Sequence, residues 1–332
     1  MAKTAVIETS RKFKSGIALF QQTPGKDDAA LQRILAKIEE LGLTENLLEL
    51  DLQGYTVLKS VLSEDKIERA KAAILNRVET VSSRTIDPLA ATTDDFHGMV
   101  YQHYLLFDDP IFQEILLEQK PLALMTYLLG ESCLLSSMGC HFRGPGGMPL
   151  AVHCDGAGPP PLPATSLVAN CNYALTPYSR ENGALIMFPG SHRKCRSPTP
   201  HENWMVGEKT LTDIVASDLS PSEIDALDWK SPAGGITMDL DPGDAVVWHG
   251  NSWHGGWRRE TPGVRMNLAA YFCRPMIATQ ERRGDPRYPE VFERYANQPR
   301  FAQLLGSDVY TGWREEGPDN NKAQFVPRGH FD

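Results

Sequence analysis

The feature that most constrains the fold is a change in texture at about residue 131. From there to about residue 273, short segments rich in β-branched, aromatic and small apolar residues alternate with glycine and proline turns. Short strands punctuated in this way are typical of a β-barrel or a double-sheet jelly roll. The candidate strands are 133–142, 149–153, 166–175, 184–188, 235–240, 244–249 and 264–273. The sequence therefore predicts a mainly β core.

The part before residue 131 is predicted to supply flanking helices. Residues 27–41 carry apolar side chains at three- and four-residue spacing, which indicates an amphipathic helix. Ser63 is a good N-cap for a second helix. Asp109 and Pro110 open a third, in which we expect Pro121 to cause a break or kink.

These patterns divide the chain into three parts. Residues 1–45 are predicted to be an N-terminal extension with one helix, and residues 46–275 a jelly-roll domain. An insert at 197–232, with a short helix near 221–228, has the character of a lid or loop. Residues 276–332 are a polar tail that we expect to pack on the domain.

Composition excludes several classes of partner. The net charge is −9, which argues against nucleic-acid binding and gives no support for an anionic membrane surface. No apolar run approaches the ~18 residues that span a bilayer. The six cysteines form no C-x-x-C pair, so we expect reduced thiols and a cytoplasmic protein. We separately expect a monomer or homodimer.

A metal site is indicated by His153-Cys154-Asp155 and a later histidine. Alternate residues of a strand point to one face, so His153 and Asp155 can point inward together while Cys154 packs away from them. An H-x-D pair alone also fits an exposed strand end. Two later histidines are available as the third ligand: we favour His254, and the alternative for His249 is a structural role in the turn. Two imidazoles and one carboxylate on one face of an octahedral metal are typical of non-haem iron oxygenases.

Further family-type segments are GYTVL at 54–58, ENGALIMFPGSH at 181–192, DPGDAVVWH at 241–249 and, after His254, Arg265. Together with the H-x-D pair they resemble the phytanoyl-CoA dioxygenase family of iron(II)/2-oxoglutarate oxygenases. Arg265 follows His254 by eleven positions, the spacing that the family uses between its last iron ligand and its 2-oxoglutarate arginine. The resemblance covers roughly residues 50–275.

The resemblance implies a double-stranded β-helix core of the cupin-like, jelly-roll type. It implies that iron(II) is held by His153, Asp155 and His254, with O₂ and 2-oxoglutarate as cosubstrates and ascorbate as a supporting reductant. Arg265 would bind the distal carboxylate of 2-oxoglutarate through its guanidinium fork. Asn172 lies where the family often has a larger side chain; its amide could donate to a carboxylate there.

The expected reaction is oxidation of an unactivated C–H bond in a small-molecule metabolite or acyl chain, as in secondary metabolism, with release of succinate and CO₂. Halogenating relatives replace the carboxylate ligand with a small residue, so Asp155 favours hydroxylation over halogenation. Two alternatives stay open: a zinc-dependent hydrolase or isomerase that uses the same triad, and a non-catalytic jelly-roll protein. Arg265 argues against the first and the complete triad against the second.

Other residues lie near the ligands in sequence. The turn Pro189-Gly190-Ser191-His192 is predicted to be structural. Candidate substrate-pocket residues, each with core or rim packing as its alternative, are Phe142, Arg143, Tyr173, Trp253 and Trp257.

Overall fold

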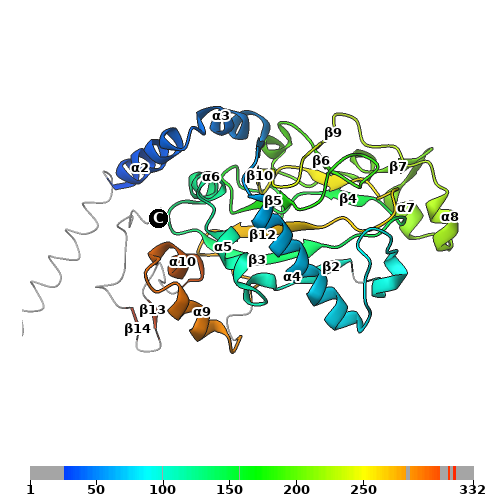
Figure 1. Ribbon diagram of the computed structural model, residues 1–332. Helices are drawn as coiled ribbons and strands as arrows, with labels where there is room; N and C mark the ends of the chain where they lie inside the picture. Colours follow the sequence, from blue (N-terminus) through cyan, green and yellow to red (C-terminus); the bar gives the residue numbers. More distant parts are fainter. Residues whose placement is uncertain are drawn as a thin grey trace, which may run out of the picture.

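Two antiparallel sheets form the centre of the computed structural model, which describes residues 26–98, 100–156, 158–281, 285–306, 313–314 and 317–318 (Figure 1). The larger sheet has the strand order β1 (Tyr55–Leu58), β10 (Ala245–His249), β5 (Val168–Ala174), β12 (Asn267–Cys273), β3 (Leu134–His141) and β2 (Tyr101–His103). The smaller sheet has the order β4 (Leu150–His153), β11 (His254–Gly256), β6 (Leu185–Met187) and β9 (Ile236–Thr237). Two further pairs are β7 (Met205–Val206) with β8 (Lys209–Thr210), and β13 (Trp313–Arg314) with β14 (Gly317–Pro318).

The strand order confirms the predicted mainly β, jelly-roll class. Neighbouring strands are far apart in sequence: β10 lies between β1 and β5, and β11 lies between β4 and β6. The described strands form two separate sheets and do not close into a barrel. Residues of both sheets meet in an inner apolar cluster that includes Tyr178 and Leu185.

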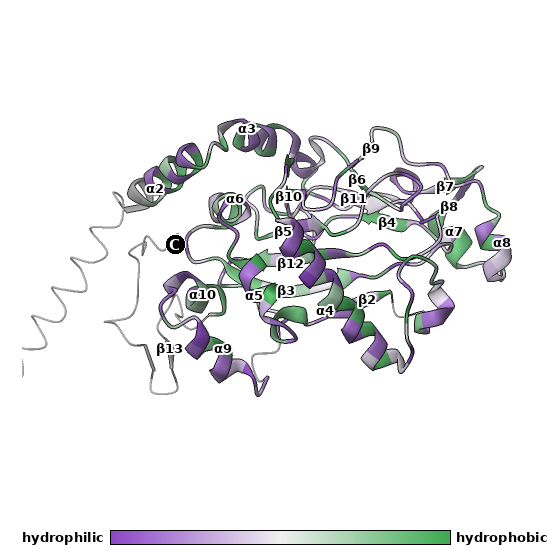
Figure 2. Cartoon of the chain, viewed as in Figure 1, coloured by the Kyte–Doolittle hydropathy of each residue, from purple (hydrophilic) through white to green (hydrophobic). Residues whose placement is uncertain are grey.

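Helices cover the outer face of the six-stranded sheet. These are α4 (Glu64–Ser82), α5 (Pro110–Leu116) and α6 (Gln119–Leu129) (Figure 1). The alternating residues Ala169, Cys171 and Tyr173 of β5 join the core beneath these helices, whereas Asn170 and Asn172 point to the inside. Helix α4 carries mixed apolar and polar surface, as expected of an amphipathic helix (Figure 2).

The predicted helix starts are present, and so is the predicted break: Leu117, whose carbonyl the ring of Pro121 would contact in a continuous helix, lies between α5 and α6. The Ser63 side chain accepts a hydrogen bond from Lys66 N, and that of Asp109 accepts one from Ile111 N. The third helix is interrupted before Pro121, at Leu117 and Glu118. Pro121 is the third residue of α6, where a missing N–H costs nothing because first-turn N–H groups have no intrahelical partner.

The ends of the described chain are helical. Helix α2 (Lys26–Glu40) precedes α3 (Thr44–Gln53), and both extend from one side of the sheets (Figure 1). In the tail are α9 (Tyr288–Arg294) and α10 (Pro299–Leu304), of which α10 packs against β3. Residues 1–25 of the predicted extension and most of the tail after 306 lie outside the described residues. The single-turn helices are η2 (Thr93–Phe96), η3 (Leu105–Phe107), η4 (Ser191–Lys194) and η5 (Pro200–Glu202).

The insert at 197–232 packs tightly on β4. It contains α7 (Leu211–Val215) and α8 (Pro221–Asp225) besides the β7–β8 pair. Trp204 is fully buried and donates through Nε1 to Leu150 O at 2.7 Å, while Asn203 exchanges two hydrogen bonds with the backbone of Val152. The insert therefore supports the strand that ends at His153. Among the described helices, none has the length and apolar character needed to cross a bilayer.

Candidate metal centre

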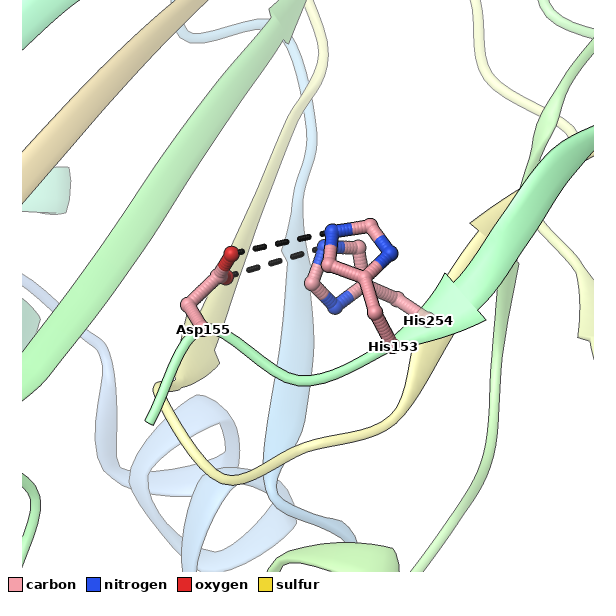
Figure 3. Close-up of side chains that lie close together, drawn as sticks. All are labelled: His153, Asp155 and His254. Atoms are coloured by element: carbon pink, nitrogen blue, oxygen red, sulfur yellow. Dashed lines mark ion pairs between the residues drawn. The ribbon is translucent and has the colours of Figure 1, made fainter. Parts of the chain in front are cut away.

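Two strands and the loop that follows one of them bring three ligand-type side chains together. His153 ends β4, His254 begins β11, and the two are register partners in the smaller sheet. Asp155 follows two residues after His153. Its oxygens lie 3.8 Å from His153 Nε2 and 3.6 Å from His254 Nε2 (Figure 3). The three ligand atoms all lie within 4.8 Å of one another, as a shared metal ion requires.

Both imidazoles are oriented by backbone carbonyls. Nδ1 of His153 lies 2.8 Å from Ala151 O, and Nδ1 of His254 lies 3.1 Å from Ser252 O. Each ring therefore places its proton on Nδ1 and turns the lone pair of Nε2 toward Asp155, the usual arrangement of a metal-bound histidine. Burial holds the pKa of His254 below its usual value, which keeps that lone pair available.

The carboxylate of Asp155 is fixed from the other sheet. Its Oδ2 accepts hydrogen bonds from Asn170 Nδ2 at 2.8 Å and Trp248 Nε1 at 3.0 Å. The hydroxyl of Tyr271 donates to the backbone oxygen of the same residue at 3.3 Å. These three donors come from β5, β10 and β12, so the six-stranded sheet positions Asp155, which lies in the loop after β4 of the smaller sheet.

His249 and Cys154 lie outside this cluster. His249 Nδ1 accepts from Asn251 N at 3.0 Å, and its Nε2 lies 3.2 Å from Ala164 O. It is thus a structural histidine of the turn. The Cys154 sulfur lies 3.7 Å from Ser197 Oγ and packs among apolar side chains of the insert, on the side away from the ligands.

The three ligands line a cavity of about 390 Å³ between the sheets. Arg265 and Arg143 line it too, and each donates its backbone N–H to the other's carbonyl, at 2.8 and 3.0 Å. The remaining lining residues are Tyr101, Ser137, His141, Leu150, Asn170, Asn172, Tyr178, Leu185, Trp248, Gly255, Gly256, Asn267, Ala269, Tyr271 and Gln280.

The two arginines give the cavity a cationic end. Arg265 is 5% exposed, donates through Nη1 to Gly183 O, stacks over the Tyr178 ring and has a buried Nε without a partner. Arg143 donates through Nη2 to Met148 O. Burial, with Arg265 nearby, lowers the pKa of Arg143 to about 10. No described carboxylate forms an ion pair with either guanidinium, so this end is suited to an anionic ligand.

Four of the five predicted substrate residues lie elsewhere, which corrects the prediction. Phe142 is fully buried and packs against Phe96, with ring centroids 5.0 Å apart. Tyr173 is buried under the helices and donates to Ile115 O. Both are strand neighbours of cavity residues and therefore point to the opposite face.

The two tryptophans among the predicted substrate residues, Trp253 and Trp257, form structural hydrogen bonds outside the cavity of the triad. Trp253 is buried and donates to Arg196 O at 2.8 Å. Trp257 donates to Thr237 Oγ1 at 2.8 Å and lines a separate small cavity. Of the predicted substrate set, Arg143 alone lines the cavity of the triad. Asn172 also lines it, and its Oδ1 accepts from Asn267 Nδ2 at 2.8 Å.

The sequence reasoning missed several cavity residues. His141 lies two positions before Arg143, and Asn170 lies two before Asn172, so the period-2 pattern used for His153 and Asp155 also applies to them. Nothing in the sequence indicates that Tyr101 lies in the cavity, because β2 has only three residues and its surroundings show no clear apolar periodicity.

Two of the segments that resemble family motifs form structural hydrogen bonds between elements. In the DPGD segment, the Asp244 carboxylate accepts from Lys59 Nζ at 2.6 Å and Ser60 N at 2.9 Å, which joins β1 to β10. In the PGSH segment, Gly190 takes a φ of 74°, and Ser191 Oγ accepts from Trp253 N at 2.8 Å. His192 lies away from the cavity, with its ring 5.5 Å from that of His249.

Comparison with known proteins assigns the family. The model of the phytanoyl-CoA dioxygenase (PhyH) family matches residues 50–267. The chain belongs to this family. It is 27% identical over 252 residues to dioxygenase af480 of Aspergillus fumigatus, which covers 73% of this chain and 71% of that protein. It is 23% identical to the peroxisomal phytanoyl-CoA dioxygenase of Mus musculus, covering 66% of this chain and 64% of the mouse protein.

Solved structures support the fold. HygX from Streptomyces hygroscopicus, crystallised with nickel and 2-oxoglutarate, superposes with a TM-score of 0.52 at 17% identity, over 71% of this chain and 88% of that one. Family membership and the triad confirm the prediction of an iron- and 2-oxoglutarate-dependent dioxygenase that acts on a small molecule. The zinc-dependent and non-catalytic alternatives are not favoured.

Proposed function

We propose that this family member hydroxylates a C–H bond of a small-molecule metabolite or acyl chain, with His153, Asp155 and His254 as its iron ligands. The observation that carries the assignment is the convergence of this triad in one cavity with Arg265. Two imidazole nitrogens and a carboxylate are a donor set that suits iron(II) and leaves positions for cosubstrates.

When bound, iron(II) and 2-oxoglutarate supply the activation of O₂ and two of the electrons for its reduction. The chain's own residues position the cosubstrate and shield the metal site from water. Arg265 receives the distal carboxylate of 2-oxoglutarate with its free donors, and Asn172 with Asn267 forms a polar wall beside it. The 4% exposure of His254 keeps bulk water from that side of the metal.

The carboxylate at 155 supports hydroxylation over halogenation. Asp155 occupies the place that a halide needs, and it is fixed by two side-chain donors. A cytoplasmic location stays a prediction of this proposal; the six cysteines are free thiols. Monomeric or homodimeric assembly stays a prediction of the same kind, as does the absence of nucleic-acid and membrane partners.

The direct test is succinate formation by the purified protein supplied with iron(II), ascorbate, O₂ and 2-oxoglutarate, with and without a library of small molecules. We expect slow uncoupled succinate release, accelerated by a compound that gains one oxygen. Asp155→Ala should abolish both. Glu202→Gln, which alters a surface carboxylate paired with Arg196, should retain both and serves as the matched control. Iron-independent turnover would contradict the proposal.

A further inference from the structure

The metal cavity contains a second guanidinium that the binding of 2-oxoglutarate leaves without a ligand. Arg143, just beyond the end of β3, and Arg265, just before β12, are bridge partners, so their side chains stand next to each other on the inner face. Both line the cavity of the triad. Arg265 is the expected partner of the distal carboxylate of 2-oxoglutarate, and Arg143 is therefore available to another anionic group.

The two guanidiniums are turned toward different strands of the smaller sheet. Arg265 Nη1 donates to Gly183 O, two residues before β6, whereas Arg143 Nη2 donates to Met148 O at 2.9 Å, two residues before β4. Strand β11 lies between β4 and β6. Because neighbouring strands lie about 4.8 Å apart, two strands that flank a third are separated by about 10 Å. This arrangement favours two separate anionic groups over one carboxylate shared by both arginines.

The charges in the cavity also favour a second anion. The charged side chains of its described lining are Arg143, Arg265 and Asp155, because burial, with both arginines nearby, lowers the pKa of His141 and keeps it neutral. A divalent metal ion, Asp155, doubly negative 2-oxoglutarate and Arg265 together carry no net charge. The positive charge of Arg143 is then uncompensated. Such a charge is costly in a buried site, and one negative charge on the substrate would remove that cost.

The part of the chain that the structure describes offers Arg143 no acidic partner. Burial and the neighbouring Arg265 lower the pKa of Arg143 to about 10, and no described carboxylate opposes that shift. Between residues 30 and 306, the residues outside the description are Met99, Ala157 and 282–284, which read Arg-Arg-Gly, and none of them is acidic. With a pKa of about 10, Arg143 stays charged at neutral pH.

Arg143 is both held in place and open to a ligand. Its side chain is partly exposed, whereas Arg265 is 5% exposed. The loop that carries its Met148 anchor is fixed by the insert, since Asp225 of α8 accepts a hydrogen bond from Gly147 N at 2.6 Å. Among described residues, Met148 alone accepts from the Arg143 side chain, so the other guanidinium donors are left for a carboxylate.

We propose that Arg143 binds a carboxylate of the substrate itself, so that the substrate is a small organic acid with a single negative charge. The inference deepens the proposed function and rests on it, since it takes the metal and 2-oxoglutarate as already bound. A forked pair between guanidinium and carboxylate fixes one end of the substrate, and thereby determines which C–H bond faces the metal.

The test compares acids with their neutral amides on the full chain loaded with nickel and saturating 2-oxoglutarate, so that the acids do not occupy the cosubstrate site. The probe pairs are phenylacetate with phenylacetamide and hexanoate with hexanamide, each titrated by ligand-observed NMR. We expect at least one acid to bind about tenfold or more tightly than its amide, because only the acid forms the charge-assisted pair. Arg143→Gln should abolish this preference, and Arg143→Lys, which keeps the charge, should recover part of it.

The matched control is Arg193→Gln, at an arginine that donates to Asp51 O outside the metal cavity, and it should keep the preference for the acid. Arg143→Gln should also keep its affinity for 2-oxoglutarate. Its melting temperature should equal or exceed that of the wild type, because the substitution removes one of two neighbouring like charges.

Four results would overturn the inference. These are equal binding of acids and amides, failure of both acids to bind, an acid preference that survives in Arg143→Gln, and a loss of 2-oxoglutarate affinity in Arg143→Gln as large as in Arg265→Ala. The last result would make Arg143 a second clamp for the cosubstrate. A failure of the proposed function would appear differently, as no 2-oxoglutarate binding to the nickel-loaded wild type.

Discussion

At the scale of single residues, position along the chain decides which side chains join the cluster of His153, Asp155 and His254. His153 and Asp155 share a face, and Cys154 between them packs into the insert. The same alternation explains why Phe142 and Tyr173 lie in the core although their neighbours line the cavity. The triad could be predicted from the sequence because the H-x-D pattern carries this alternation visibly. The substrate wall could not, because nearness in sequence does not specify the face.

Substitutions of His254 and His249, the two histidines considered as third ligand, should differ in their effect on nickel affinity. His254→Ala should weaken nickel affinity at least 100-fold, because one of three protein ligands is lost. His249→Ala should keep nickel affinity within about threefold, and lower the unfolding free energy by about 1–3 kcal/mol through its lost turn contacts. Calorimetric nickel titration checks both, and equal losses in the two variants would refute the assignment.

Arg265 should govern cosubstrate affinity. Arg265→Ala should raise the dissociation constant for 2-oxoglutarate about 10- to 100-fold, because charge-assisted hydrogen bonds to its distal carboxylate are lost. The nearby Arg258→Ala is the control, since Arg258 donates to Asp225 O outside the metal cavity. Unchanged 2-oxoglutarate binding in Arg265→Ala would exclude it as the clamp.

At the scale of elements, the turn between β10 and β11 carries the chain from one sheet to the other. Predicted strand bounds agree with the observed ones within a few residues where apolar alternation is long, as in β5 and β12. Strands β2 and β11 were not predicted, because three residues do not establish a period and β11 is His-Gly-Gly. Helices α9 and α10 were also missed, since their short apolar pattern is interrupted by polar residues.

Gly250 in this turn should tolerate no side chain. A Cβ there would lie 2.3 Å from Val168 O, so Gly250→Ala must displace backbone close to the third ligand. We expect a loss of about 3 kcal/mol in unfolding free energy and weaker nickel binding. Gly42→Ala, at a positive-φ glycine with open space around it, should cost about 1 kcal/mol and leave nickel binding unchanged. Urea denaturation with nickel titration distinguishes them.

At the scale of the whole molecule, buried neutral histidines make the fold sensitive to acid. Burial lowers the pKa of His249 to about 4, and it holds those of His141 and His192 below their usual value. A lowered pKa in the folded state means that the unfolded chain binds more protons at mildly acidic pH. The stability that these groups contribute is therefore present above about pH 6.5 and is lost as pH falls toward 4.

The metal-free protein should accordingly lose stability between pH 7 and 5, by up to about 1.4 kcal/mol per pH unit for each such histidine. Denaturant unfolding at pH 7, 6 and 5 measures the slope. His249→Gln should show a shallower slope than the wild type, whereas His201→Gln, at an exposed position, should reproduce the wild-type slope. A wild-type stability independent of pH over this range would contradict the account.

The central claim is that one metal ion and one 2-oxoglutarate share the cavity between the sheets. Isothermal titration of 2-oxoglutarate into the wild type and Asp155→Ala, each with and without nickel, tests it most directly. We predict one site per chain in the nickel-loaded wild type, at least tenfold weaker binding without nickel, and no nickel-dependent gain in Asp155→Ala. Equally tight 2-oxoglutarate binding with and without the metal, or an undiminished nickel effect in Asp155→Ala, would show that the triad does not hold the metal that binds the cosubstrate.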